Sequence, residues 1–216
     1  MVPKSIRGII FDMDNTLLQS RIDFKAMKSE VAAWLAEKGL LPANFQADAH
    51  TTSTLLAYAS ENGATDEMIA EALRIAATHE LKGMEGAGLE PGAAELLDRL
   101  YGRYKLVIVT NNSHAAAIRA LQITGIKDRF DLIVGREQME AMKPSPSGNL
   151  TVLQHFNSLK GDQWIAIGDS WIDGRAAEDA GIPFISYGDS PSSAMAEKRV
   201  RPAAHIDKLL RLLDYI

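Results

Sequence analysis

Short runs of apolar residues, each followed at once by polar ones, recur along most of this chain. A run of this kind that ends in a turn signal predicts a buried β-strand. Five segments fit this description: 8–11, 105–109, 130–134, 164–167 and 183–187. Between them, apolar residues at helical spacing predict helices at 93–101, 115–124, 150–159 and 175–180, and a last helical face formed by Ile206, Leu209, Leu210, Leu213 and Ile216. Continuous apolar strands that alternate with helices are typical of an α/β fold, here a doubly wound parallel sheet with helices on both faces.

Residues 23–83 show a different pattern, in which no strand-like run interrupts the helical spacing. We expect a first helix that ends at Gly39, a second that Asn44 caps and that runs toward Ser60, and a third that begins at Thr65. Segment 83–92 follows, with glycine at four of its ten positions and one proline, and it predicts a linker that can act as a hinge. The predicted domains are a core of residues 1–16 and 89–216 and a small inserted helical domain of residues 17–88.

The composition is that of a folded globular chain: 216 residues, 46% hydrophobic and 24% charged, with a net charge of −5. No basic stripe indicates a nucleic-acid partner, and no polybasic or amphipathic segment indicates a membrane surface. Cysteine is absent, which excludes disulfides, thiolate chemistry and cysteine-bound zinc. The first apolar run is too short for a signal peptide and no run approaches the length of a membrane span, so we expect a cytoplasmic protein. The sequence carries no signal for an oligomeric state.

Two carboxylates, Asp12 and Asp14, directly follow the first predicted strand. Residues two apart in an extended chain point to the same side, so these side chains should face one small volume. Their mutual repulsion then requires a cation, a shared proton or solvent, and two solvated turn aspartates are the simpler alternative. Ligands of open α/β sheets bind beyond the carboxyl ends of the strands. Further polar clusters stand at or after such ends: Thr110 with Asn111, Asp169 with Asp173, and Lys143 in a loop.

Taken together, four short motifs resemble those of the haloacid dehalogenase superfamily: Asp12-x-Asp14-x-Thr16, Thr110 after an apolar strand, Lys143-Pro144, and Gly168-Asp169-x-x-x-Asp173. The helical insert is similar to the type 1 cap of that superfamily, and the whole layout is most similar to its phosphoglycolate phosphatase-like subgroup. The resemblance implies a Rossmann-like core and an enzyme, a phosphatase that hydrolyses phosphoric monoesters. Its substrate would be a small phosphorylated metabolite.

The resemblance also implies a role for each matching residue. Asp12 would be the nucleophile that forms an aspartyl phosphate, and Asp14 the general acid and later the base for the attacking water. Mg²⁺ would be the cofactor, in agreement with an all-oxygen ligand set, and would be bound by Asp12, the Asp14 main-chain carbonyl and Asp169. The other matches would have supporting roles: the phosphate would be held by Thr110, the Asn111 amide and Lys143, and the metal ligands would be supported by Asp173 and Thr16.

Two other functions stay open at this point. One is a phosphosugar mutase of the same superfamily, which would return the phosphoryl group to a sugar hydroxyl instead of water. The other is a regulatory or binding module that has kept the fold and lost turnover. Asn15 stands where most relatives of this kind carry glycine, with asparagine a known alternative, and this predicts a positive φ at that position.

Overall fold

The computed structural model describes residues 5–42, 44–190 and 193–216, so the parts of the predicted domains at 1–4, 43 and 191–192 lie outside the described residues. The chain divides into two compact units, Met1–Ser20 with Ala87–Ile216, and Arg21–Gly86. Within the described ranges, no helix combines the length and the apolar character that crossing a membrane requires.

The first unit is built around a six-stranded sheet in which all neighbouring strands are parallel. The order across the sheet is β5-β4-β1-β6-β7-β8. The strands are β1 (Gly8–Phe11), β4 (Lys105–Val109), β5 (Leu132–Val134), β6 (Trp164–Gly168), β7 (Phe184–Tyr187) and β8 (Ala204–Ile206). Successive strands are added outward from β1, first on one side and then on the other. The predicted α/β class with a doubly wound parallel sheet is therefore confirmed.

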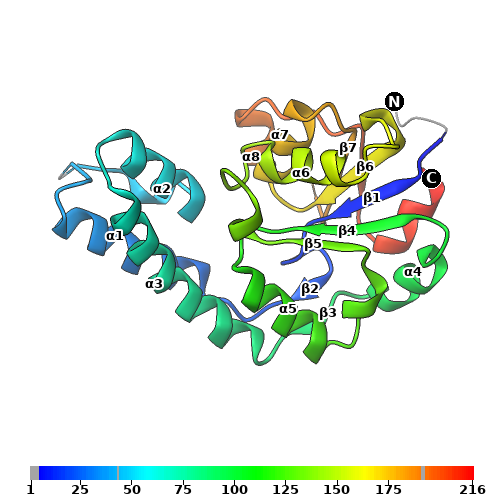
Figure 1. Ribbon diagram of the computed structural model, residues 1–216, viewed down its shortest axis with the longest axis horizontal. Coiled ribbons are helices and arrows are strands. Elements are labelled where there is room, and N and C mark those ends of the chain that lie inside the picture. The colour runs from blue at the N-terminus through cyan, green and yellow to red at the C-terminus, as the bar shows by residue number, and fades with distance from the viewer. Residues whose placement is uncertain (1–4, 43, 191–192) are drawn as a thin grey trace. The chain divides into compact units, whose positions relative to one another are not determined.

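Helices cover both faces of this sheet, as Figure 1 shows. Helices α4 (Ala93–Leu100) and α5 (His114–Ile123) lie on one face, and α6 (Ser147–His155) and α7 (Trp171–Asp179) on the other. The unit also contains α8 (Ser193–Glu197) and a set of short 3₁₀ helices, η2 (Lys127–Arg129), η3 (Arg136–Gln138), η4 (Gly161–Gln163) and η5 (Leu209–Asp214). Because helices bury both faces, the strands are apolar along their whole length and do not alternate with polar residues.

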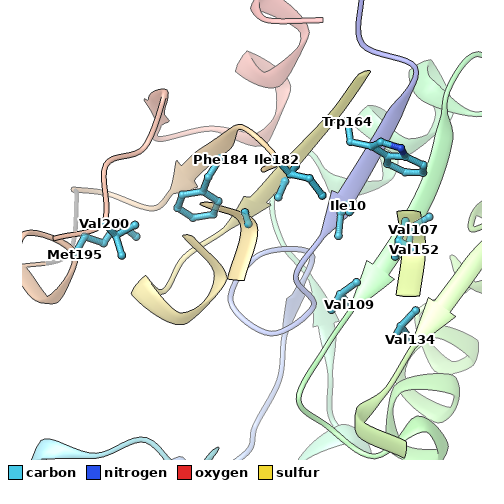
Figure 2. Close-up of a cluster of buried hydrophobic side chains, with 12 residues drawn as sticks. Ile10, Val107, Val109, Val134, Val152, Trp164, Ile182, Phe184, Met195 and Val200 are labelled. Carbon is cyan, nitrogen blue, oxygen red and sulfur yellow. The ribbon is translucent and has the colours of Figure 1, made fainter. Parts of the chain in front are cut away.

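A core of buried side chains fills the space between the sheet and the α6–α7 layer (Figure 2). It joins strand residues such as Ile10 and Val107 to Val152 of α6. Trp164, at the start of β6, is fully buried beside β1. A Cβ atom on Gly8 would come within 2.3 Å of the Trp164 ring, so only glycine fits opposite the indole. This packing holds β1 in register with β6, and β1 leads directly to Asp12.

The second unit consists of three α-helices, α1 (Phe24–Glu37), α2 (Thr52–Glu61) and α3 (Asp66–Met84), with a 3₁₀ turn η1 (Ala47–Ala49). The first helix ends at Glu37, close to the predicted end at Gly39, whose φ is 73°, and the third begins at Asp66, next to the predicted start at Thr65. The prediction that Asn44 caps the second helix is wrong. The cap is Thr51, whose hydroxyl accepts from the Thr54 amide while the Thr54 hydroxyl accepts from the Thr51 amide. This reciprocal pair fixes the start of α2 at Thr52.

The linker predicted at 83–92 is shorter than expected. Helix α3 includes Gly83, where a Cβ atom would lie 2.6 Å from the Ile22 Cα, so this glycine permits a close approach and is no hinge. Two short strands, β2 (Leu18–Gln19) and β3 (Gly88–Leu89), pair antiparallel within the first unit. The junctions between the units therefore lie at residues 20/21 and 86/87, against the predicted 16/17 and 88/89.

Three boundaries in the core also differ from the predictions. Helix α6 occupies residues 147–155 where 150–159 was predicted, and α7 begins at Trp171, four residues before the predicted start. The single helical face predicted at the C-terminus is wrong, because Ile206 ends strand β8 and Leu209 begins a 3₁₀ helix. Period-3.6 spacing in so short a segment does not distinguish a helix from a strand followed by a tight turn.

Candidate active site

The chain makes a tight turn as it leaves β1. The Met13 carbonyl accepts hydrogen bonds from the amides of Leu17 and Leu18, and Asn15 takes a φ of 55°. The predicted positive φ at Asn15 is thus confirmed, and asparagine is one of the few non-glycine side chains that tolerate it. The turn brings Thr16 back over the strand end, so that its hydroxyl donates to Asp12 Oδ2 at 3.3 Å.

Lys143 provides the cation closest to Asp12. Its ammonium donates to Asp12 Oδ1 and Asp173 Oδ1, both at 2.6 Å, and to the Val109 carbonyl at 2.9 Å. The side chain is only 5% exposed. Burial by itself lowers the pKa of this ammonium, but Asp12 and Asp173 outweigh burial and raise the pKa above its usual range. Lys143 is therefore a charged bridge between the end of β1 and helix α7.

Asp12, Asp169 and Asp173 form a compact acidic cluster around this ammonium. Each offers one carboxylate oxygen, and the three oxygens lie within 4.8 Å of one another. Burial, followed by the neighbouring carboxylates, raises the pKa of Asp169 to about 8 and that of Asp173 to about 6. A Cβ atom on Gly168 would lie 2.6 Å from the Asp173 carboxyl carbon, so glycine is required where the end of β6 meets the first turn of α7.

Asp14 has a different environment from Asp12 although it stands two residues away. It is buried, and its Oδ2 accepts from the side-chain amide of Asn112 at 2.5 Å. Its Oδ1 and the Ser20 hydroxyl are buried without a hydrogen-bond partner among the described residues. Burial and the Asp12 charge raise the pKa of Asp14 to about 7, against weaker lowering effects of Ser20, Asn112 and Lys143. Asp14 can therefore hold or release a proton near neutral pH.

Thr110 and Asn111 lie at the carboxyl end of β4, as predicted, but the Asn111 side chain is turned toward the lysine loop. Its amide nitrogen donates to the Lys143 carbonyl at 2.9 Å, and its amide oxygen accepts from the Lys143 main-chain N–H at 2.8 Å. The Thr110 hydroxyl accepts from the main-chain N–H of Asn112 at 3.2 Å. These contacts fix the backbone of Lys143, which precedes the cis peptide bond to Pro144.

Two residues of the site lie outside the motifs that the sequence presents. Asn112 is the hydrogen-bond partner of Asp14, and the polar run 110–113 at a strand end was the signal that could have found it. Arg136, in η3, donates through its amide to the Asn112 carbonyl at 3.0 Å and through its guanidinium to the Asn111 carbonyl at 3.4 Å. Nothing in the local sequence distinguishes Arg136 from a surface arginine.

The structure therefore brings all the predicted site residues to one edge of the sheet. With three carboxylates and one ammonium, the cluster of Asp12, Asp169, Asp173 and Lys143 carries a formal charge of −2 when ionised. A set of hard oxygen ligands with this charge fits a divalent cation such as Mg²⁺. The simpler reading of Asp12 and Asp14 as solvated turn residues does not hold, because both side chains are largely buried and hydrogen-bonded.

Comparison with known proteins agrees with this geometry. The sequence profile of the haloacid dehalogenase-like hydrolases matches residues 9–187, which is most of the chain. The chain therefore belongs to the haloacid dehalogenase-like hydrolase family, and the resemblance noted from its motifs is confirmed. It is 29% identical over 189 residues to a phosphoglycolate phosphatase of Rhodobacter capsulatus, with 83% of each chain covered.

Two solved structures share the fold. YfnB of Bacillus subtilis, described as bound to magnesium and as showing interdomain movement, has a TM-score of 0.63, 21% identity and coverage of 98% of both chains. A Thermotoga maritima protein provisionally named β-phosphoglucomutase has a TM-score of 0.66 and 20% identity, with 98% of this chain and 100% of that chain covered. At this level of identity the two structures establish the fold alone.

Proposed function

We propose that this chain is a magnesium-dependent phosphatase that hydrolyses a small phosphorylated metabolite through a phosphoryl group carried on Asp12. The observation that carries the proposal is the contrast between two carboxylates on one turn. Asp12 is ion-paired with Lys143, whereas Asp14 is buried, has one oxygen without a hydrogen-bond partner among the described residues and has a pKa of about 7. Two neighbouring acids whose environments differ in this way are suited to separate roles as nucleophile and proton donor.

In the first step a carboxylate oxygen of Asp12 attacks phosphorus and the bond to the leaving oxygen breaks. The proton of Asp14 passes to that oxygen, so the alcohol leaves neutral. In the second step a water molecule attacks the phosphorus of the aspartyl phosphate and gives its proton back to Asp14. Inorganic phosphate and the original Asp12 carboxylate result. Lys143 orients Asp12 and offsets the negative charge that accumulates during both steps.

Asp12, Asp169 and the main-chain carbonyl of Asp14 would hold Mg²⁺. Bound there, the ion would neutralise charge on the transferring phosphoryl oxygens. Asp173 would keep Lys143 in place, because its other oxygen accepts from the Ser170 amide at 3.0 Å and the side chain cannot swing away freely. Thr110 and Asn111 would contribute to phosphate binding, and the contacts of Asn111 indicate that it does so mainly by positioning the Lys143 loop.

The substrate would be small, and 2-phosphoglycolate is the first candidate because relatives across most of the chain carry the name phosphoglycolate phosphatase. The three-helix unit would act as a cap that selects against bulky substrates. A cytoplasmic location, and the lack of nucleic-acid and membrane partners, stay predictions from the sequence. The mutase and the silent binding module remain the alternatives. For the mutase, the Thermotoga maritima protein provisionally named β-phosphoglucomutase shares the fold of this chain.

The test measures phosphate release from 2-phosphoglycolate and from p-nitrophenyl phosphate, with Mg²⁺ and with EDTA. We expect turnover only with Mg²⁺, none in Asp12→Asn, and unchanged turnover in Asp128→Asn, whose carboxylate is 99% exposed. Isomerised sugar phosphate without phosphate release would establish the mutase. The absence of any turnover across a panel of phosphorylated metabolites would favour the silent module, and full activity in Asp12→Asn would overturn the proposal.

A further inference from the structure

A groove of about 430 Å³ lies in the first unit, away from the acidic cluster. Its walls come from Arg7 just before β1, from residues 101–105 at the start of β4, from residues 128–131 before β5, and from the segment that follows α6. All of these precede or flank the amino ends of strands, whereas Asp12 and Thr110 follow the carboxyl ends. Strand β4 separates the two edges by about 13 Å, at about 3.3 Å per residue. A volume of this size is typical of small-molecule sites.

The groove has an excess of positive charge in a chain whose net charge is −5. Three ion pairs form in and beside the groove: Lys105 with Asp131 at 2.6 Å, Arg129 with Asp98 at 2.6 Å, and Lys127 with Asp128 at 3.8 Å. Two lining guanidiniums, those of Arg7 and Arg103, make no ion pair with any of the described residues. The groove is therefore left with two unbalanced positive charges.

Two arginines of the wall lie over aromatic rings that also line the groove. The Arg129 guanidinium lies over the Tyr101 ring at 5.0 Å from its centroid, and the Arg103 guanidinium lies over Tyr104 at 5.9 Å. Tyr101 is 52% exposed, which is unusual for a large aromatic side chain. Guanidiniums held over rings keep their N–H groups at the edge of the stack, where they can donate to an anion.

We propose that this groove binds a small molecule that joins a phosphate group to a planar ring, of the nucleoside monophosphate class. The guanidiniums of Arg7 and Arg103 match the charge of a phosphate dianion, and each can donate two parallel hydrogen bonds to phosphate oxygens. The exposed face of Tyr101 offers a stacking surface for the ring. Because the groove and the acidic cluster lie at opposite ends of β4, the ligand would bind without competing for Asp12. This proposal does not depend on the proposed phosphatase activity.

The test is isothermal titration of AMP, adenosine and inorganic phosphate into the full-length Asp12→Asn protein with Mg²⁺ present, a form that should not consume AMP. The same titrations are made with Arg7→Gln/Arg103→Gln added, and with Arg201→Gln added as the control, since Arg201 is an exposed arginine outside the groove. We expect AMP to bind more tightly than adenosine or phosphate, the double substitution to weaken AMP binding at least tenfold, and the control to leave it unchanged.

Arg7 and Arg103 are exposed, so the double variant should fold and should melt at the same temperature as the protein with both arginines. With Asp12 intact, Arg7→Gln/Arg103→Gln should hydrolyse p-nitrophenyl phosphate as fast as the unsubstituted protein. Three results would overturn the proposal: no AMP binding to the parent, the same AMP affinity in the double variant, or phosphate binding as tight as AMP. A failure of the phosphatase proposal would appear instead as absent hydrolysis in the Asp12-intact protein, with the AMP titrations unaffected.

Discussion

Removal of the metal should make the stability of this protein fall as pH rises, because Lys143 alone does not balance the three carboxylates of the acidic cluster. The group that matters most is Asp169, whose pKa is about 8 in the folded chain against 3.8 for an ordinary aspartate. A folded-state pKa above the unfolded value means that the folded chain holds its proton longer than the unfolded chain does. The stability lost through this group is therefore zero below about pH 4, grows as pH rises, and is complete above about pH 8.

The size of the effect follows from the difference between these two pKa values. At about 1.4 kcal/mol per pKa unit, the ceiling is roughly 6 kcal/mol. The Asp169 side chain keeps some contact with solvent and Lys143 opposes the effect, so we expect about 2–3 kcal/mol between about pH 5 and pH 8. For a chain of this length, that corresponds to a fall of roughly 5–10 °C in melting temperature. Asp14 and Asp173, whose pKa values are also raised, add to the fall in the same direction.

The assay is thermal unfolding in EDTA and in Mg²⁺ across this pH range, for the parent, Asp169→Asn and the exposed-residue control Asp128→Asn. In EDTA at about pH 8, Asp169→Asn should melt above the parent, because it removes a buried charge that Lys143, already paired with Asp12 and Asp173, balances only in part. Mg²⁺ should raise the melting temperature of the parent more at pH 8 than at pH 5, and should have little effect on Asp169→Asn. If Asp169→Asn melts below the parent in EDTA at pH 8, the reasoning about this cluster is refuted.

Three further predictions concern other parts of the site and the fold. Asn112→Ala removes the 2.5 Å hydrogen bond to the Asp14 carboxylate, so kcat on 2-phosphoglycolate should fall about 10- to 100-fold, with a smaller loss on p-nitrophenyl phosphate, whose leaving group needs no proton. Equal losses on both substrates would contradict this. Gly83→Ala should lower the free energy of unfolding by about 1–3 kcal/mol in urea titrations, since its Cβ would lie 2.6 Å from Ile22, and Gly88→Ala, where nothing lies within 4 Å, should not. Ca²⁺ should compete with Mg²⁺ and inhibit phosphate release, because its longer bonds and higher coordination number disturb the in-line geometry; full turnover with Ca²⁺ alone would show that the site tolerates that geometry.

The sequence predicts the sheet well, and also the edge of the sheet at which the polar clusters lie, because both depend on short, local patterns. A run such as Lys105–Val109 can be read as a strand from its own residues, and a polar cluster after it must lie at the ligand-binding edge. The residues that the sequence did not reveal act through contacts across the fold. Asn112 meets Asp14 and Arg136 meets Asn111 only because β1, β4 and β5 are neighbours in the sheet.

The errors at element ends have a similar cause. The start of α2 is decided by the mutual hydrogen bonds of Thr51 and Thr54, which compete with the equally plausible cap at Asn44. Glycine usually interrupts helices, so the sequence places Gly83 in the linker, whereas the close approach of Ile22 requires a glycine inside α3. Ile206 pairs with Tyr187 as part of β8, a partner almost twenty positions away that no local window contains.

The most direct test of the account asks whether a phosphoryl group is bound to Asp12 during turnover. Asp14→Asn protein is mixed with p-nitrophenyl phosphate and Mg²⁺, quenched in acid and analysed by peptide mass spectrometry. This substrate needs no proton for its first step, while the second step lacks its base, so the intermediate should accumulate. We predict a mass increase of one phosphoryl group on the peptide that contains Asp12, sensitive to hydroxylamine and absent from Asp12→Asn. Phosphate release by Asp14→Asn with no phosphorylated peptide, or phosphorylation that persists in Asp12→Asn, would contradict the central claim.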